Sequence, residues 1–111
     1  MDRKRVEKYY HAICKAEKIS PIPLRFERVG FGGACTTYNA KTMEPLYISF
    51  DLNRVDDIET AILHEITHQY FLLKDKNAFP GKKDQSAKFK KVENRLVEKY
   101  LYTEFSEILW A

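Results

Sequence analysis

Residues 61–69 read Ala-Ile-Leu-His-Glu-Ile-Thr-His-Gln, and the spacing inside this stretch predicts both a helix and a metal site. On an α-helix, residues four apart lie one above the other, so His64 and His68 would face the same way and share one ion. Glu65 is turned about 100° from His64 around the helix axis, and would flank the ion without being a ligand. Two imidazoles suit zinc, whose open coordination position would hold a water of lowered pKa. The pattern therefore predicts one zinc ion per chain, with Glu65 as the general base that takes the proton of this water.

The residues around this stretch support a helix over residues 56–73. Asp56 and Glu59 have the spacing of a capping box, and acidic residues in a first turn stabilise the positive end of the helix dipole. A polar loop with Pro80-Gly81 follows over residues 74–83. Beyond it, apolar residues at helical spacing predict a last long helix from about 84 to 102: Phe89, Val92, Leu96, Val97, Tyr100 and Leu101. The tail, residues 103–111, ends in apolar residues and is expected to pack back on the domain.

The N-terminal half predicts one helix and three strands. Residues 2–18 carry an apolar stripe at helical spacing, and Pro21 and Pro23 end this helix because proline cannot continue it. Alternation predicts a half-buried strand from Leu24 to Val29. Glycines then break the chain, and two further strands are expected at 34–40 and 46–50, the last with Leu46, Ile48 and Phe50 on one face. The order of helix, three strands and two helices predicts an α+β fold in a single domain over residues 1–111.

Composition restricts the class of protein. The 111 residues are 44% hydrophobic and 14% aromatic, which argues against disorder despite 32% charged residues. No apolar run approaches the roughly 20 residues of a membrane span, and we expect a cytoplasmic protein without membrane partners. Two cysteines, Cys14 and Cys35, exclude a four-cysteine zinc site. The net charge is +3, with basic residues gathered at 3–8 and 82–91; they form either solvated faces or contacts with phosphates or an acidic partner.

A catalytic zinc site usually has three protein ligands, so the two histidines need a partner. The only other histidine, His11, lies beside the apolar stripe of the first helix, where solvent or a capping role suits it better. The last helix offers Asp84, Gln85 and Glu93.

Three stretches together resemble the SprT-like metallopeptidase domain, a minimal zincin. They are Tyr-Ile-Ser-Phe-Asp-Leu-Asn at 47–53, the motif stretch at 61–69, and Lys-Asp-Gln-Ser-Ala-Lys-Phe at 83–89. The resemblance covers nearly the whole chain. It implies an N-terminal helix, a small three-stranded antiparallel sheet, the His-Glu-x-x-His helix and a C-terminal helix. It also implies proteolysis of protein substrates, which are DNA-associated proteins in several members.

The third stretch departs from the family pattern, which reads His-Gly-x-x-Phe and supplies the third zinc ligand through its histidine. Alignment on Phe89 places Gln85 at the histidine and Ser86 at the glycine. A glutamine amide oxygen is a neutral and weaker ligand than imidazole. The candidates for the third ligand are therefore, in order, Gln85, Glu93, Asp84 and His11.

Two functions follow as hypotheses. The first is zinc-dependent hydrolysis of peptide bonds in protein or peptide substrates, with Glu65 as base, and with weak association with DNA or DNA-bound proteins. A strand at 34–40 or 46–50 would pair with an extended substrate by edge addition. Tyr38, Tyr47 and Tyr70 are candidate oxyanion donors, although aromatic residues mostly pack in cores. The alternative, motivated by Gln85, is a degenerate zincin fold that binds protein or nucleic acid without cleaving it.

Overall fold

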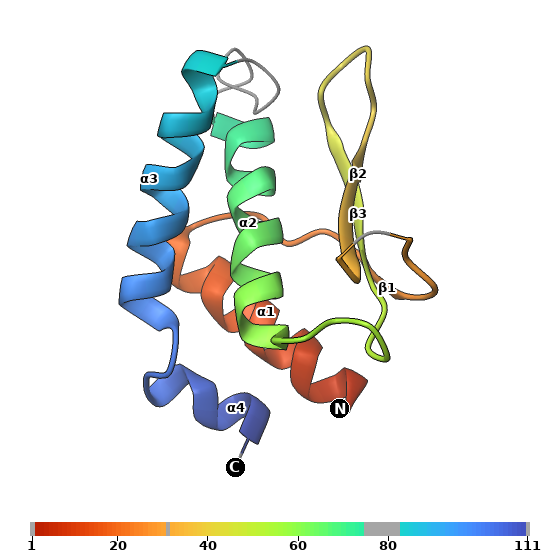
Figure 1. The fold of residues 1–111 in the computed structure, drawn as a ribbon, viewed down its shortest axis with the longest axis vertical. Coiled ribbons are helices and arrows are strands. Elements are labelled where there is room, and N and C mark those ends of the chain that lie inside the picture. The colour runs from red at the N-terminus through yellow and green to blue at the C-terminus, as the bar shows by residue number, and fades with distance from the viewer. Residues whose placement is uncertain (1, 31, 75–82, 111) are drawn as a thin grey trace.

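The structure, a computed structural model, describes residues 2–30, 32–74 and 83–110, without the side chains of residues 83–86. An N-terminal helix, α1 (Arg3–Glu17), precedes three strands, β1 (Leu24–Phe26), β2 (Ala34–Tyr38) and β3 (Pro45–Phe50). Two long helices follow, α2 (Ile58–Lys74) and α3 (Lys83–Tyr100), and then a 3-10 turn, η2 (Glu104–Ser106), and a short helix, α4 (Glu107–Trp110). This order confirms the predicted α+β class (Figure 1).

Helix α1 forms where the apolar stripe predicted it. The Asp2 carboxylate caps it by accepting a hydrogen bond from the Lys4 backbone N–H at 2.8 Å. The helix ends at Glu17, and the next residue, Lys18, adopts the left-handed conformation. Its buried face is the predicted stripe: Val6, Tyr9, Tyr10, Ile13 and Cys14. The helix thereby forms one wall of the core.

The sheet is mixed, so the expectation of a purely antiparallel sheet was wrong. Its order is β1-β3-β2, with β2 antiparallel and β1 parallel to the central β3. The connection between β1 and β2 crosses the end of β3, because the Glu27 N–H bonds to the Phe50 carbonyl and the Asp51 N–H bonds to the Gly33 carbonyl. Gly33 is required in this crossing: its φ is +79°, and a Cβ would lie 2.8 Å from the Val55 nitrogen.

Two details of the strands also differ from the predictions. Strand β1 ends at Phe26 rather than Val29, whose buried side chain lies in the crossing segment. Leu46 is 44% exposed, whereas Ile48 and Phe50 are fully buried. The register of the β2–β3 ladder shifts between Thr37 and Tyr38, near the start of β3, so regular alternation does not extend to Leu46.

Helix α2 begins one residue later than the capping-box spacing predicted. Asp57, and not Asp56, caps it: one oxygen of Asp57 accepts from the Glu59 N–H at 3.1 Å and the Thr60 N–H at 3.4 Å. The Glu59 carboxylate does not close a capping box, because it is fully buried and holds the C-terminal tail.

The predicted packing of the tail against the domain is confirmed. Leu109 is buried, and Ser106 and the Trp110 indole donate hydrogen bonds to Glu59, although the Trp110 side chain is 57% exposed. From α1, Tyr9 donates to the same carboxylate at 3.2 Å. The tail therefore holds the first turn of α2 in place through the Glu59 carboxylate.

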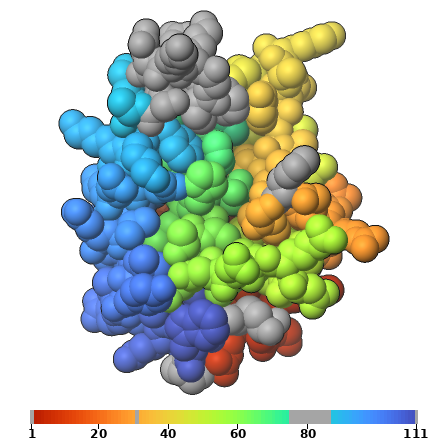
Figure 2. Space-filling model, in the orientation of Figure 1, coloured from red at the N-terminus to blue at the C-terminus, as the bar shows by residue number. Residues whose placement is uncertain are grey.

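Helix α2 lies between the sheet and α3, with α1 crossing beside it (Figure 1). Four of its buried apolar side chains, Ile58, Ile62, Leu63 and Ile66, join those of α1, β3 and α3 in one core. In the space-filling view, residues of α2 and its preceding loop are visible between α3 and the strands (Figure 2). Because α2 lies between them, its side chains can contact β2 on one side and α3 on the other. Among the described helices, none is long and apolar enough to cross a bilayer.

Candidate metal centre

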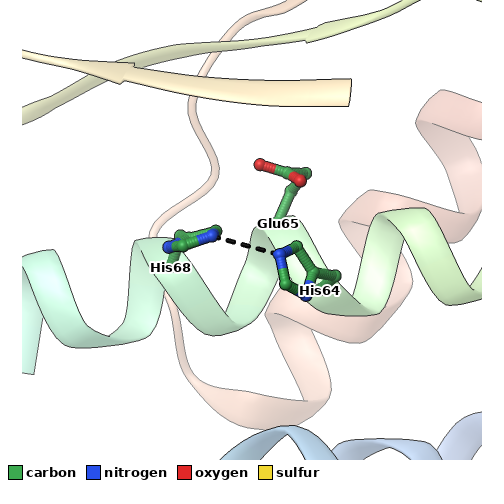
Figure 3. A group of neighbouring side chains, drawn as sticks. All are labelled: His64, Glu65 and His68. Carbon is green, nitrogen blue, oxygen red and sulfur yellow. Dashed lines mark hydrogen bonds between the residues drawn. The ribbon is translucent and has the colours of Figure 1, made fainter. Parts of the chain in front are cut away.

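His64, Glu65 and His68 form a compact donor group on α2, with one ligand atom of each within 4.8 Å of the others (Figure 3). The Nε2 atoms of His64 and His68 face one another at 3.2 Å. In tetrahedral zinc sites with Zn–N distances of 2.0–2.1 Å, two ligand nitrogens lie about 3.3 Å apart. The two imidazoles therefore have the separation that one shared ion requires, and this group could hold a metal ion.

Glu65 lies on the sheet side of the group and is only 4% exposed. The Thr36 hydroxyl, on β2, donates to its Oε1 at 2.8 Å. Burial raises the pKa of the Glu65 carboxyl above its ordinary value, and the bond from Thr36 and the charge of His64 offset only part of this increase. A carboxyl group with a raised pKa takes up and returns a proton more readily near neutral pH.

His68 is kept neutral by its surroundings. Burial, and secondarily the proximity of His64, lowers the pKa of His68 to about 4. Phe89 on α3 packs over both rings, with its centroid 4.6 Å from that of His68 and 5.2 Å from that of His64. At neutral pH the His68 ring is therefore uncharged, with a lone pair available for a metal ion.

Glu93 on α3 contacts the other nitrogen of His64, Nδ1. Its second oxygen lies 3.3 Å from the Lys90 ammonium group. Burial alone would raise the pKa of Glu93, but the bonds from His64 and Lys90 outweigh it and hold this pKa below the ordinary value. An ionised carboxylate at Nδ1 fixes the tautomer that leaves Nε2 free, which is the usual support of a metal-bound histidine.

The remaining predicted candidates fall into three groups: those whose side chains are not described, those away from the donor group, and one that lines a cavity beside it. The side chains of Asp84 and Gln85 are outside the described residues, although α3 begins at Lys83. His11 is exposed on α1, where its ring packs edge-on against Tyr10, and it is not in the donor group. Tyr47 stacks under the Arg25 guanidinium, and Tyr70 packs against Phe71, so both are packed aromatics. Tyr38, in contrast, lines a cavity at the donor group.

Two cavities open on either side of the donor group and share Ala34, His64 and Glu65. One, of about 280 Å³, extends toward the C-terminal end of α2; its other lining residues are Cys35, Thr36, Tyr38, His68 and Leu72. The other, of about 470 Å³, extends toward the N-terminal end of α2; its other lining residues are Gly32, Val55, Asp56, Asp57, Thr60 and Ala61. The cleft therefore runs along α2, with the edge strand β2 as one wall.

Sequence reasoning missed Thr36 and Cys35. Alternation along residues 34–38 groups Ala34, Thr36 and Tyr38 on one side of a strand, but the pattern does not say which helix this side faces. The contact between Thr36 and Glu65 joins residues 29 positions apart, for which a single sequence carries no signal.

Cys35 offers a test of this geometry in the metal-free protein. Burial, and secondarily the charge of Glu65, raises the pKa of the Cys35 thiol. Replacing Glu65 by glutamine removes that charge, so more thiolate is present at pH 8 and alkylation by iodoacetamide should accelerate. The acceleration should be modest, because burial is the larger cause of the raised pKa. Cys14 is an internal control, since it is fully buried and its pKa is raised to about 11. An unchanged rate at Cys35 would contradict the electrostatic influence of Glu65 on this thiol.

Comparison with known proteins gives no family for this chain. No protein-family model matches the sequence, no curated protein is significantly similar to it, and no solved structure matches the fold.

Proposed function

We propose that this chain is a zinc-dependent peptidase of the SprT-like type, which hydrolyses peptide bonds in protein or peptide substrates. One observation carries the proposal. The two Nε2 atoms 3.2 Å apart have the spacing of ligands of one ion, and the buried Glu65 carboxylate lies beside them on the same helix.

In this proposal His64 and His68 hold the zinc ion and Gln85 is its third protein ligand, as alignment on Phe89 implies. Glu93 keeps His64 in the required tautomer through Nδ1. Phe89 restricts the rotation of both imidazole rings. When bound, the zinc ion would supply Lewis acidity, which lowers the pKa of water and polarises a carbonyl group.

Glu65 performs the proton transfers. Its carboxylate takes a proton from the attacking water and later returns one to the leaving amine. The Thr36 hydroxyl orients this carboxylate through one oxygen, which leaves the other oxygen for the proton. Because Glu65 is largely buried, few water molecules compete for this proton before the carboxyl group passes it to the amine nitrogen, which allows the amine to leave.

The shape of the cleft suits an extended chain. A cavity lies on each side of Glu65, so a peptide could continue in both directions from the bond that is cleaved. Strand β2 is at the edge of the sheet, and its outer backbone groups would pair with such a peptide by strand addition. DNA-bound proteins are included among the proposed substrates through the family resemblance alone.

Metal content tests this proposal directly. The protein is loaded with zinc, desalted exhaustively and submitted to elemental analysis. We expect about one zinc per chain, in keeping with a single site, and none in His64→Ala. His11→Ala is the matched control, because His11 is exposed and outside the donor group. Gln85→Ala should also lose zinc if its amide is a ligand.

No retained zinc in the wild-type protein would overturn the peptidase proposal. The replacement of the family histidine by Gln85 would then favour the second candidate, a zincin-like domain that binds protein or nucleic acid without cleaving it.

A further inference from the structure

A larger cavity lies at the other edge of the sheet, where β1 and β3 end side by side. It has a volume of about 600 Å³, and its lining residues are Arg3, Phe26, Glu27, Arg28, Phe50, Asp51, Leu52, Asn53 and Arg54. None of them lines the two cavities at the donor group. Its volume is in the range of small-molecule sites.

Three arginines from separate segments converge on this cavity. Arg3 comes from the first turn of α1, Arg28 follows β1 and Arg54 follows β3. Within the described parts of the chain, neither Arg3 nor Arg28 forms an ion pair, and Arg54 lies 3.9 Å from Asp51. Two guanidinium groups therefore remain free to bind an anion.

The two carboxylates in the lining are already engaged. Glu27 accepts a hydrogen bond from the Ser49 hydroxyl at 2.6 Å and lies 3.6 Å from the Arg25 guanidinium, outside the cavity. Asp51 is buried and accepts from the backbone N–H groups of Val29 and Asn53. These contacts occupy the two carboxylates, and the lining has three arginines against two acidic residues, so the cavity keeps a net positive charge.

An aromatic ring lies among these charges. Phe26 is the last residue of β1, and the Arg3 guanidinium lies 5.5 Å from the centre of its ring. Guanidinium groups bind phosphate through paired N–H donors, and both guanidinium planes and aromatic rings stack on nucleobases. A phosphate attached to a planar base matches this combination better than a simple anion.

From this juxtaposition we infer that the cavity at the ends of β1 and β3 is a nucleotide-phosphate site, which takes either a free mononucleotide or one unit of a single strand. This inference goes beyond the proposed peptidase function and does not depend on it. Arg3 and Arg28 contact the phosphate, and Phe26 contacts the base.

The test is a titration of the full chain with a fluorescein-labelled oligothymidylate of about eight residues, followed by anisotropy over a range of salt concentrations. We expect saturable binding. Arg3→Gln and Arg28→Gln should each weaken it several-fold and reduce the slope of log K against log salt by about 0.7, the value for one single-strand phosphate contact. Lys8→Gln is the matched control, with the same loss of charge on an exposed residue of α1 that does not line the cavity.

Two competitors complete the experiment. An abasic oligomer of equal length should bind at least about fivefold more weakly, because it lacks base stacking. Displacement of the oligomer by thymidine monophosphate would assign the site to free nucleotides, and lack of displacement to single strands. The inference is overturned if the oligomer does not bind, if the abasic oligomer binds equally well, or if Lys8→Gln weakens binding as much as Arg28→Gln.

Discussion

Glu65→Gln is expected to reduce the rate of peptide cleavage by about 10²–10⁴-fold, the usual contribution of a general base. Glutamine keeps the shape of the side chain, and its amide oxygen can still accept the hydrogen bond from Thr36, but it cannot take up a proton. Zinc content should stay at the wild-type value because His64 and His68 are unchanged. The measurement pairs initial cleavage rates on a fluorescein-labelled unstructured protein with elemental analysis of the same samples.

Glu98→Gln is the control for this experiment, because it makes the same chemical change at an exposed position of α3. It should cleave at the wild-type rate. If Glu65→Gln cleaved as fast as the wild type, Glu65 would not be the base. If Glu65→Gln lost zinc, the carboxylate would be a ligand, and its assignment to proton transfer would be wrong.

The parts of the fold that were predicted correctly are those specified by local spacing. The stripe on α1 and the four-residue interval between His64 and His68 are properties of one helix, and the structure has both. The predicted apolar residues of the last helix include Phe89, Leu96 and Tyr100, which are buried in α3.

The errors concern contacts between distant segments or choices between adjacent residues. Alternation along 24–26 identifies a half-buried strand, but it carries no information on the direction of the strand beside it. The parallel pairing of β1 with β3 depends on the crossing segment that ends at Gly33. At the start of α2, Asp56 and Asp57 are both suitable N-cap residues. The Glu59 side chain is buried under the tail and cannot close a capping box with Asp56, and Asp57 is the residue that caps the helix.

The candidate site shows the same division. The sequence supplied His64, Glu65 and His68 from one helical stretch, and it named Glu93 as a candidate because of its residue type and helix. The atom that Glu93 contacts, His64 Nδ1, depends on the packing of α3 against α2. The partner of Glu65, Thr36, comes from the sheet and could not be identified from spacing.

This packing leads to the second large effect: Glu93→Gln should weaken zinc binding by about 10–100-fold, the usual cost of losing the partner of a metal-bound histidine. A neutral amide at Nδ1 does not favour the required tautomer as strongly as a carboxylate, and it adds no basicity to the imidazole. Competition titration with a chromophoric zinc chelator measures the change, with Glu98→Gln as control on the same helix.

The size of the loss separates two roles of Glu93. A loss of about 10–100-fold, with zinc still bound at saturation, is the result for a residue that orients His64. A loss as complete as that of His64→Ala would make Glu93 itself a ligand, because removing a ligand takes away a metal bond, whereas removing its partner only weakens one. Unchanged affinity would contradict both roles, and the contact between Glu93 and His64 would then serve only the packing of α3 on α2. Gln85→Ala is measured alongside. Loss of zinc binding in both variants fits Gln85 as the third ligand and Glu93 as the residue that orients His64. Loss in Glu93→Gln alone would make Glu93, and not Gln85, the third zinc ligand.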